Sequence, residues 1–321
     1  MRALYLFYGL RSNIKRIHFD FIEAFMNLQG VDVKVYGPNE KYLNGDLISP
    51  IEFDINLQLN DVIKELDIDI LMLPELVLCK KFFSYCGVEK VKTIPKVIFE
   101  SDFYAITDVD WYKEMGIDLM LMLHPYDPSI LPIASVWLPP SASREQFLVE
   151  KIDDDRVNKV TFVGGGRYST NKYYKTRQDA IRILENEGLL DCYGEVGYDD
   201  YPKILKMYRS ALSCSFPPLD FPPIKTFEIM ASGTTLITTP FKYKDILFGS
   251  EKCFFTYNKD CNNILNVVDY IQHNAEEAKY IAEVALHKVR DNHLFEHRAK
   301  ELFLILSSLL THNSIPKKWG I

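Results

Sequence analysis

The hydrophobic positions of the chain form short apolar runs that are separated by segments with helical spacing. Runs such as 3–8 (ALYLFY) and 68–73 (IDILML) are typical of strands buried on both faces of a parallel sheet. The pattern predicts eleven strands, over 3–8, 31–36, 68–73, 96–99, 118–123, 135–138, 160–163, 190–193, 211–215, 235–239 and 253–257. It predicts helices over 14–28, 60–66, 110–115, 176–187, 201–210, 226–231, 261–274 and 275–310, the last of these breaking near 290–292.

The alternation of strands and helices stops once and then starts again. The segment 149–159 (VEKIDDDRVNK) is charged and has no apolar period, so we interpret it as a linker. Two βα-rich halves predict an α/β protein with two facing Rossmann-like domains, residues 1–150 and 151–296, followed by an amphipathic helix over 297–321. In such sheets ligands bind outside the carboxyl ends of the strands, so we expect a site in the cleft between the domains.

Composition narrows the class of protein. The chain has 321 residues, of which 47% are hydrophobic and 25% charged, and this balance excludes disorder as its main state. The net charge of −7 argues against a nucleic-acid partner. Six cysteines without a C-x-x-C pair favour a reducing, cytoplasmic setting. No apolar stretch approaches the length of about 18 residues that a membrane span needs, so we expect no transmembrane segment.

The segment 216–240 (FPPLDFPPIKTFEIMASGTTLITTP) carries the clearest chemistry. Proline is accepted in the first turn of a helix and not in its interior, so a helix is expected to begin near Pro223. Glu228 then lies early in that helix, where a carboxylate is favourable and can accept two ribose hydroxyls. Lys225 and Thr226 lie in the first turn, whose free N–H groups attract anions. The pattern predicts a pocket for a phosphorylated ribose.

A second group of residues follows the strand predicted over 160–163. Glycines 164–166, Gly165 among them, allow the backbone to approach a phosphate, and Arg167, Lys172 and Arg177 supply positive charge. The pattern is neither the dinucleotide fingerprint G-x-G-x-x-G nor a Walker A loop. An equally plain interpretation is that each of these charges is simply solvated.

The run 225–238 (KTFEIMASGTTLIT) resembles the signature of GT-B glycosyltransferases, in which two acids eight positions apart precede a helix end and a strand. Glu228 matches the second acid, which holds the nucleotide ribose, and Asp220 stands in place of the first, which lies near the donor sugar. The resemblance is to the retaining family-4-like group. Lys225 and the segments 137–147 (WLPPSASREQF) and 191–215 resemble the CgeB-like, spore-coat branch.

The resemblance implies roles for further residues. Arg167 and Lys172 match the pair that clamps the donor diphosphate, whereas the CgeB-like branch uses the position of Arg177. Tyr198 or Tyr201 would stack on the base, and Gly9 and Arg11 would face the phosphates and the acceptor. The candidate catalytic residues are Asp220, Asp102, which stands where retaining enzymes often have a histidine, and His124. A structural role remains open for His124 and for the tyrosines.

The predicted function is transfer of a hexose from a nucleotide-diphosphate sugar, a UDP-sugar in the first instance, to an unidentified glycan, lipid, protein or small molecule. The resemblance implies retention, no metal, no cofactor, and a final helix that returns to the first domain. Asp153, Asp154 and Asp155 follow no strand and therefore do not form a metal-binding DxD motif. Alternatives are a non-catalytic nucleotide-sugar-binding or coat protein, a nucleotide-sugar 2-epimerase and, less in keeping with the acidic charge, an enzyme that modifies DNA bases.

Overall fold

The computed structural model describes residues 1–7, 16–37, 52–54, 56–80, 87–100, 108–125, 131, 133–165, 174–197, 199–215 and 220–315, with 16–20 and 77 described by their backbone alone. The chain forms two compact units. The first comprises Met1–Pro139 and Phe295–Ile321, and the second comprises Pro140–Leu294. The C-terminal segment therefore belongs to the first unit.

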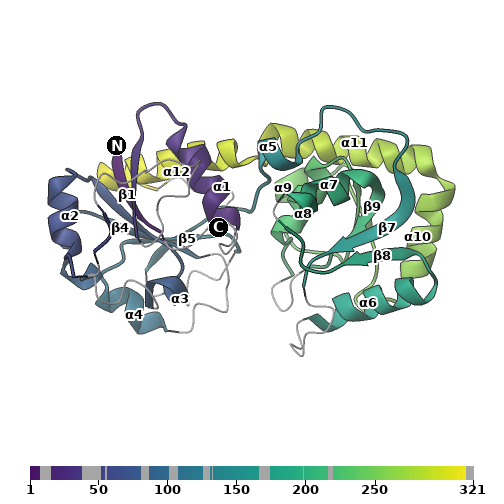
Figure 1. The fold of residues 1–321 in the computed structure, drawn as a ribbon, viewed down its shortest axis with the longest axis horizontal. Helices are drawn as coiled ribbons and strands as arrows, with labels where there is room; N and C mark the ends of the chain where they lie inside the picture. Colours follow the sequence, from purple (N-terminus) through teal and green to yellow (C-terminus); the bar gives the residue numbers. More distant parts are fainter. Residues whose placement is uncertain are drawn as a thin grey trace. The chain divides into compact units, whose positions relative to one another are not determined.

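The first unit is built on a parallel sheet of six strands in the order β2-β1-β3-β4-β5-β6 (Figure 1). The strands are β1 (Arg2–Leu6), β2 (Asp32–Tyr36), β3 (Ile70–Leu73), β4 (Lys96–Glu100), β5 (Leu119–Met122) and β6 (Ala134–Trp137). The helices are α1 (Arg16–Met26), α2 (Leu59–Glu65), α3 (Leu76–Leu78), the 3-10 turn η3 (Val88–Lys90), α4 (Val109–Glu114) and α12 (Phe295–Leu310).

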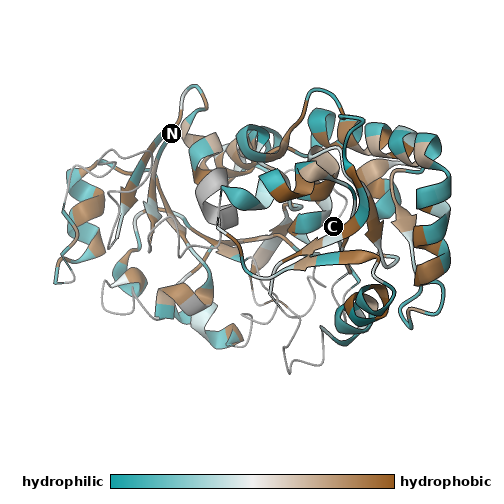
Figure 2. Ribbon diagram, turned by 45° about the vertical axis from the view of Figure 1, so that its right-hand side comes forward, coloured by the Kyte–Doolittle hydropathy of each residue, from teal (hydrophilic) through white to brown (hydrophobic). Residues whose placement is uncertain are grey.

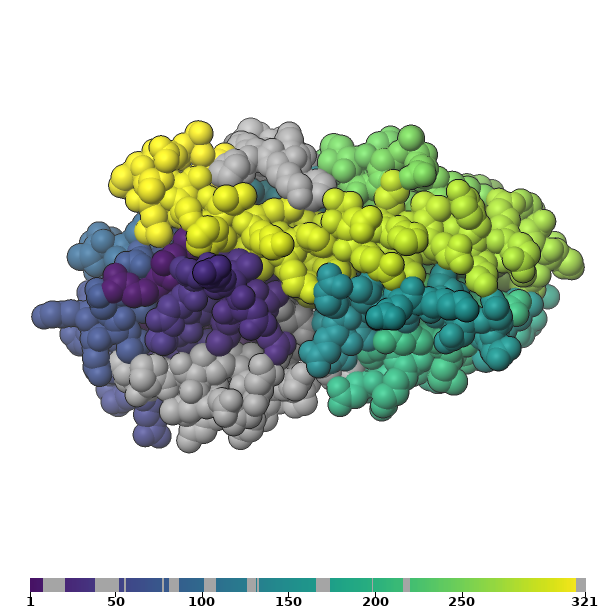
Figure 3. Space-filling view, turned by 90° about the horizontal axis from the view of Figure 1, so that it is seen from above, coloured from purple at the N-terminus to yellow at the C-terminus, as the bar shows by residue number. Residues whose placement is uncertain are grey.

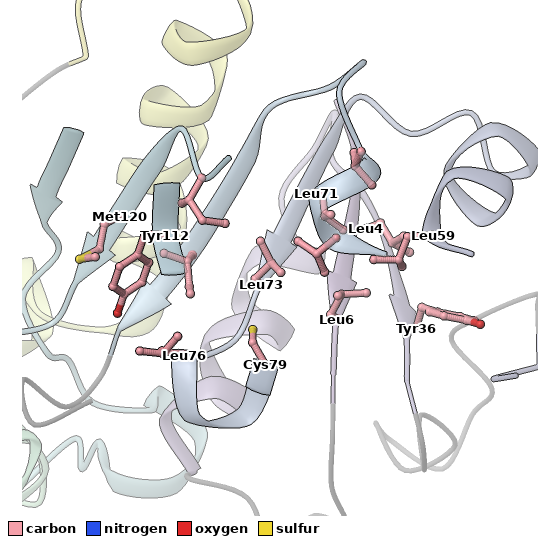
Figure 4. Close-up of a cluster of buried hydrophobic side chains, with 14 of the residues drawn as sticks. Leu4, Leu6, Tyr36, Leu59, Leu71, Leu73, Leu76, Cys79, Tyr112 and Met120 are labelled. Carbon is pink, nitrogen blue, oxygen red and sulfur yellow. The ribbon is translucent and has the colours of Figure 1, made fainter. Parts of the chain in front are cut away.

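Both faces of the first sheet are buried, which explains its continuous apolar strands. On one face Leu4, Leu71 and Met120 pack with Leu59 of α2 and Tyr112 of α4 (Figure 4). The other face is covered by α1 and α12, which lie side by side (Figure 3). There the ring of Phe21 stacks on Phe99 at 5.1 Å and meets the edge of Phe295 at 6.4 Å. The apolar stripe of α12 thus completes the core of the first unit.

The second unit contains a parallel sheet of five strands in the order β11-β10-β9-β7-β8. Hydrophobic residues run along most strands, and hydrophilic residues lie on the outer sides of many helices (Figure 2). The strands are β7 (Val157–Val163), β8 (Leu190–Tyr193), β9 (Tyr208–Leu212), β10 (Thr235–Thr238) and β11 (Phe255–Thr256). The helices are α5 (Arg144–Phe147), α6 (Lys175–Asn186), α7 (Asp200–Met207), α8 (Ile224–Ala231), α9 (Lys244–Phe248), α10 (Ile264–His273) and α11 (Ala275–Asn292).

The segment 149–159 is not a linker. It lies within the second unit, where the Val149 N–H donates to the Ala231 carbonyl at 3.1 Å and Ile152 is buried. Arg156 is also buried and donates to the carbonyls of Ser232 and Gly233 at the end of α8. The segment was interpreted as a linker because it is charged and lacks a regular apolar pattern. Such a segment can still be buried when its guanidinium group donates to the carbonyls at the end of a helix.

The helix predicted over 201–210 also ends too late. Helix α7 ends at Met207, and Tyr208 begins strand β9, where it pairs with Val157 of β7. The Tyr208 hydroxyl donates to Asp191 on β8 at 2.7 Å, which supports the extended conformation through a long-range contact. The short helices α3, α5 and α9 were not predicted, since fewer than two turns carry little periodic signal. Of the described helices, none combines the length and the apolar character that crossing a bilayer requires.

Candidate functional site

The order of the strands marks one edge of the second sheet as the place for a ligand. Strand β7 lies between β8 and β9, so the chain leaves β7 toward one side of the sheet and later continues on the other. Connections that diverge in this way leave a crevice outside the carboxyl ends of the two central strands. The turn at Gly164–Gly165 follows β7, and residues 213–215 follow β9.

Helix α8 brings a positive charge to the end of β7. The helix begins directly after Pro223, whose extended backbone forms the N-cap. In its first turn, the Lys225 ammonium donates to the carbonyl of Val163, the last residue of β7, at 2.6 Å. Gly164 has a φ of +131°, and a Cβ there would lie 2.9 Å from the Lys225 Nζ. Only glycine therefore allows the turn and the ammonium to approach this closely.

Glu228 lies one turn further along α8 and is only 5% exposed. The Tyr201 hydroxyl donates to its Oε2 at 3.0 Å, and no described residue donates to its Oε1. A buried carboxylate is expensive unless hydrogen bonds satisfy it, so the second oxygen is suited to accept a hydroxyl from a ligand. This is the chemistry that the sequence assigned to Glu228.

The turn after β7 is partly used by the protein itself. The Gly164 N–H donates to the carbonyls of Tyr193 and Gly194 at 3.1 and 3.2 Å. The Gly165 N–H meets no acceptor among the described residues, so it can donate to a phosphate. The exposed Glu195 carboxylate lies close to Gly165, since a Cβ on Gly165 would be 3.0 Å from its Oε1.

Arg177 lies in the first turn of α6, near the carboxyl ends of β7 and β9. Its guanidinium is 4.6 Å from the ring centroid of Tyr174 and 5.9 Å from that of Phe162. Burial raises the pKa of the neighbouring Cys214 thiol, a shift that the Thr239 hydrogen bond and the charge of Arg177 oppose. No described carboxylate pairs with Arg177, which leaves its charge available to an anion.

Asp220 forms an ion pair with Lys259, a residue that lies outside the motifs found in the sequence. Its backbone has a φ of +52°, and its Oδ1 accepts a bond from the Lys259 ammonium at 2.6 Å. Asp220 is 23% exposed and Lys259 is 53% exposed, so the pair is open to solvent. Sequence analysis missed Lys259 because it lies 39 positions downstream, and nothing local links it to Asp220.

Several predicted residues lie elsewhere or have other roles. The Thr226 side chain is fully buried and has no surface with which to contact a donor. Tyr201 is also buried, and its hydroxyl binds Glu228, so it does not stack on a base. His124 follows β5 in the first unit and is half-buried. Six predicted residues lie outside the described residues: Gly9, Arg11, Asp102, Arg167, Lys172 and Tyr198.

Two other features bear on the location of a ligand. In the part of the chain that the structure describes, no three His, Cys, Asp or Glu side chains are grouped so as to hold a metal ion. A cavity of about 280 Å³ lies at the opposite edge of the second sheet, where β7, β9 and β10 begin. Its lining includes Ile152, Asn158, Arg209, Gly233, Thr235 and Lys279. It is separate from the carboxyl-end site of Lys225 and Glu228.

Comparison with known proteins identifies the fold. Residues 144–303, just under half of the chain, match the family described as "Glycosyl transferase-like". A sucrose-phosphate synthase from Thermosynechococcus elongatus has the same fold, with a TM-score of 0.68 and 10% identity over 97% of this chain and 100% of that one. An α-glucosyltransferase solved with UDP and a 13-mer DNA gives a TM-score of 0.62 and 10% identity, over 97% and 99%. The chain has the GT-B glycosyltransferase fold.

The same fold also occurs in an enzyme of another class. A putative UDP-N-acetylglucosamine 2-epimerase from Listeria monocytogenes gives a TM-score of 0.58 and 11% identity, over 98% of each chain. No curated protein matches the chain by sequence. At these identities the structures establish the fold, and the chemistry has to be argued from this chain's own residues.

Proposed function

We propose that the protein is a glycosyltransferase that moves a hexose from a nucleotide-diphosphate sugar to an acceptor. The observation that carries the proposal is the pair of charges on α8. Lys225 touches the carboxyl end of β7, and Glu228 has one oxygen that no described residue occupies. The pair lies within the segment that matches the glycosyltransferase-like family. The second unit would bind the donor, and the first would bind the acceptor.

Each charge has a part in this reaction. Glu228 accepts a ribose hydroxyl, and Lys225, the Gly165 N–H and the N-terminus of α8 bind the diphosphate. Arg177 adds charge from α6. Arg167 and Lys172, which lie outside the described residues, are proposed to add more. As the bond from the anomeric carbon to the diphosphate breaks, this positive charge stabilises the leaving group. The acceptor oxygen bonds to the anomeric carbon and gives its proton to the departing diphosphate.

Stereochemistry and metal use follow from the same proposal. Attack from the face that the diphosphate leaves retains the configuration of the sugar, and the protein needs no nucleophile of its own. Positive side chains at the diphosphate take the place of a metal ion. Asp220 is the residue proposed to approach the sugar, now together with Lys259. Asp102 and His124 remain candidates from the first unit. UDP is the first nucleotide to test, and the acceptor is unassigned.

The test is a thermal-shift panel of UDP, GDP, CDP, ADP and dTDP. A ligand at 100 times its Kd that binds only the folded protein adds about 2.7 kcal/mol of stability, so one nucleotide should raise the melting temperature. Glu228→Gln keeps the size of the side chain and should abolish the shift. Glu187→Gln is the matched control, because Glu187 is exposed at the far end of α6. Failure of every nucleotide to shift the wild type would reject the proposal.

Turnover of the corresponding sugar nucleotides separates the alternatives. Release of nucleoside diphosphate, with the anomeric configuration of the product read by NMR, distinguishes retention from inversion. The same release in the presence of EDTA supports the metal-free mechanism. A 2-epimerase, the alternative that the Listeria structure favours, would yield a sugar epimerised at C2 without an acceptor. Nucleotide binding without any turnover would favour the non-catalytic alternative.

A further inference from the structure

Tyr201 connects the two charges of the candidate donor site. It is the second residue of α7 and is 9% exposed. Its hydroxyl donates to Glu228 Oε2 at 3.0 Å, and its ring centroid is 4.5 Å from the Lys225 Nζ. On the other side, its ring packs edge-on against Phe147 of α5 at 5.5 Å. One side chain, fixed by packing, therefore contacts both groups that we assign to the nucleotide.

This arrangement keeps apart two charges that would otherwise neutralise each other. Lys225 and Glu228 are three positions apart on α8, a spacing at which opposite charges commonly pair. In the described structure they form no ion pair with each other. Lys225 lies on the Tyr201 ring and the Val163 carbonyl, because the face of an aromatic ring attracts a cation. Glu228 is satisfied by the hydroxyl of the same tyrosine.

The hydrogen bond also fixes the direction of the carboxylate. A carboxylate only accepts hydrogen bonds, so the phenol proton must point to Oε2. With Oε2 occupied, the side chain cannot rotate without losing its described donor. Oε1 is then presented in one orientation, as an acceptor for a hydroxyl of the ligand. Fixing a ligand-binding group before the ligand arrives lowers the entropy that binding loses.

We propose that Tyr201 is a positioning residue that makes the site selective for ribonucleotides over 2′-deoxyribonucleotides. It acts through Glu228, whose Oε1, to which no described residue donates, accepts the ribose 2′-hydroxyl, while the tyrosine ring holds Lys225 at the phosphate. The inference rests on the proposed binding of a nucleotide donor. It adds that the preference for ribose over 2′-deoxyribose depends on the Tyr201 hydroxyl, which does not itself contact the ligand.

Tyr201→Phe is the variant that tests the inference. It keeps the ring, its contact with Lys225 and its packing on Phe147, and it removes only the hydroxyl. Binding of UDP and of 2′-deoxy-UDP would be measured by calorimetry on the full chain. A hydrogen bond to a charged group corresponds to a factor of roughly 10–100 in affinity, so the wild type should prefer UDP by at least about tenfold. In Tyr201→Phe, UDP should weaken by about tenfold while 2′-deoxy-UDP changes little.

A matched control removes the same kind of bond elsewhere. The Tyr270 hydroxyl donates to Glu277 at 2.5 Å on the exposed surface of the second unit, so Tyr270→Phe should leave both affinities unchanged. In the background of Glu228→Gln, which already removes the carboxylate that Tyr201 positions, Tyr201→Phe should cause no further loss of UDP binding.

The outcomes separate the two proposals. If the wild type binds none of the nucleoside diphosphates in the thermal-shift panel, the proposed function fails, and this inference fails with it. If UDP binding depends on Glu228 but Tyr201→Phe keeps the full preference for UDP, the inference alone is overturned. An equal loss of both nucleotides in Tyr201→Phe, with a lowered melting temperature, also overturns it, because that result describes a purely structural tyrosine.

Discussion

At the scale of single residues, the ion pair of Asp191 shows how a contact on the sheet links stability to pH. Asp191 accepts hydrogen bonds from Lys159 and from the Tyr208 hydroxyl, and these bonds lower the pKa of its carboxyl below the ordinary 3.8. Because the folded pKa is lowered, the stabilisation is present above pH 4. It is lost as the pH falls through the lowered value, where the folded protein also binds the proton.

We therefore expect Asp191→Asn to lower the free energy of unfolding by roughly 1 kcal/mol at pH 7, a modest value because the pair is partly solvated. The difference from wild type should shrink as the pH falls below 4. Urea unfolding of both proteins between pH 2 and 7 measures it. Asp155→Asn, on the exposed surface, is the control, and its free energy of unfolding should depend on pH in the same way as that of the wild type. A deficit that is constant over the whole pH range would contradict the assignment.

At the scale of elements, two helices of the second unit end on glycine but differ in what surrounds it. Gly188 after α6 and Gly233 after α8 have φ values of +68° and +63°, in the left-handed region. A Cβ on Gly188 would meet nothing within 4 Å, whereas one on Gly233 would lie 2.7 Å from Ile152. The end of the helix that carries Lys225 and Glu228 is thus packed directly under the segment 149–159.

The two glycines give a matched pair of substitutions. Gly188→Ala should cost only the left-handed backbone, about 1–2 kcal/mol. Gly233→Ala should cost about 1–3 kcal/mol more, because the added methyl group overpacks against Ile152. Chemical denaturation of both variants measures the difference. An equal decrease in the free energy of unfolding in both variants would show that Ile152 moves aside without cost and that its packing does not fix the end of α8.

The elements that sequence predicted well are those whose signal is local. The buried strands repeat apolar residues along the chain, and the prolines before α8 place its start within a residue or two, which set Lys225 and Glu228 correctly on one helix. Lys259 and the Glu228-binding role of Tyr201 were missed, since each depends on contacts between segments 27 or more positions apart. Periodicity carries no information about such pairs. The linker was misread for the same reason.

At the scale of the whole molecule, the chain crosses between two units twice, after Pro139 and after Leu294. Each unit has its own sheet and its own buried cluster of hydrophobic side chains. The second crossing returns α12 to the first unit, where Leu302 is completely buried, and the Arg298 guanidinium donates to the Pro139 carbonyl at 2.8 Å. This hydrogen bond joins the two chain segments of the first unit, Met1–Pro139 and Phe295–Ile321, close to the points where the chain leaves and re-enters the unit.

This organisation predicts two unfolding transitions that single substitutions can tell apart. Leu302→Ala creates a cavity in the first unit, and Ile264→Ala creates one in the second, each costing about 2–5 kcal/mol. In differential scanning calorimetry each variant should lower one transition and leave the other in place, since chains with several domains depart from two-state behaviour. The nucleoside diphosphate selected by the thermal-shift panel should raise the transition that Ile264→Ala lowers, because Lys225, Glu228 and Arg177 of the proposed donor site lie in that unit. A single transition whose temperature both variants lower equally would show that the two units unfold together. A nucleotide that raised only the transition lowered by Leu302→Ala would show that the nucleotide binds to the first unit.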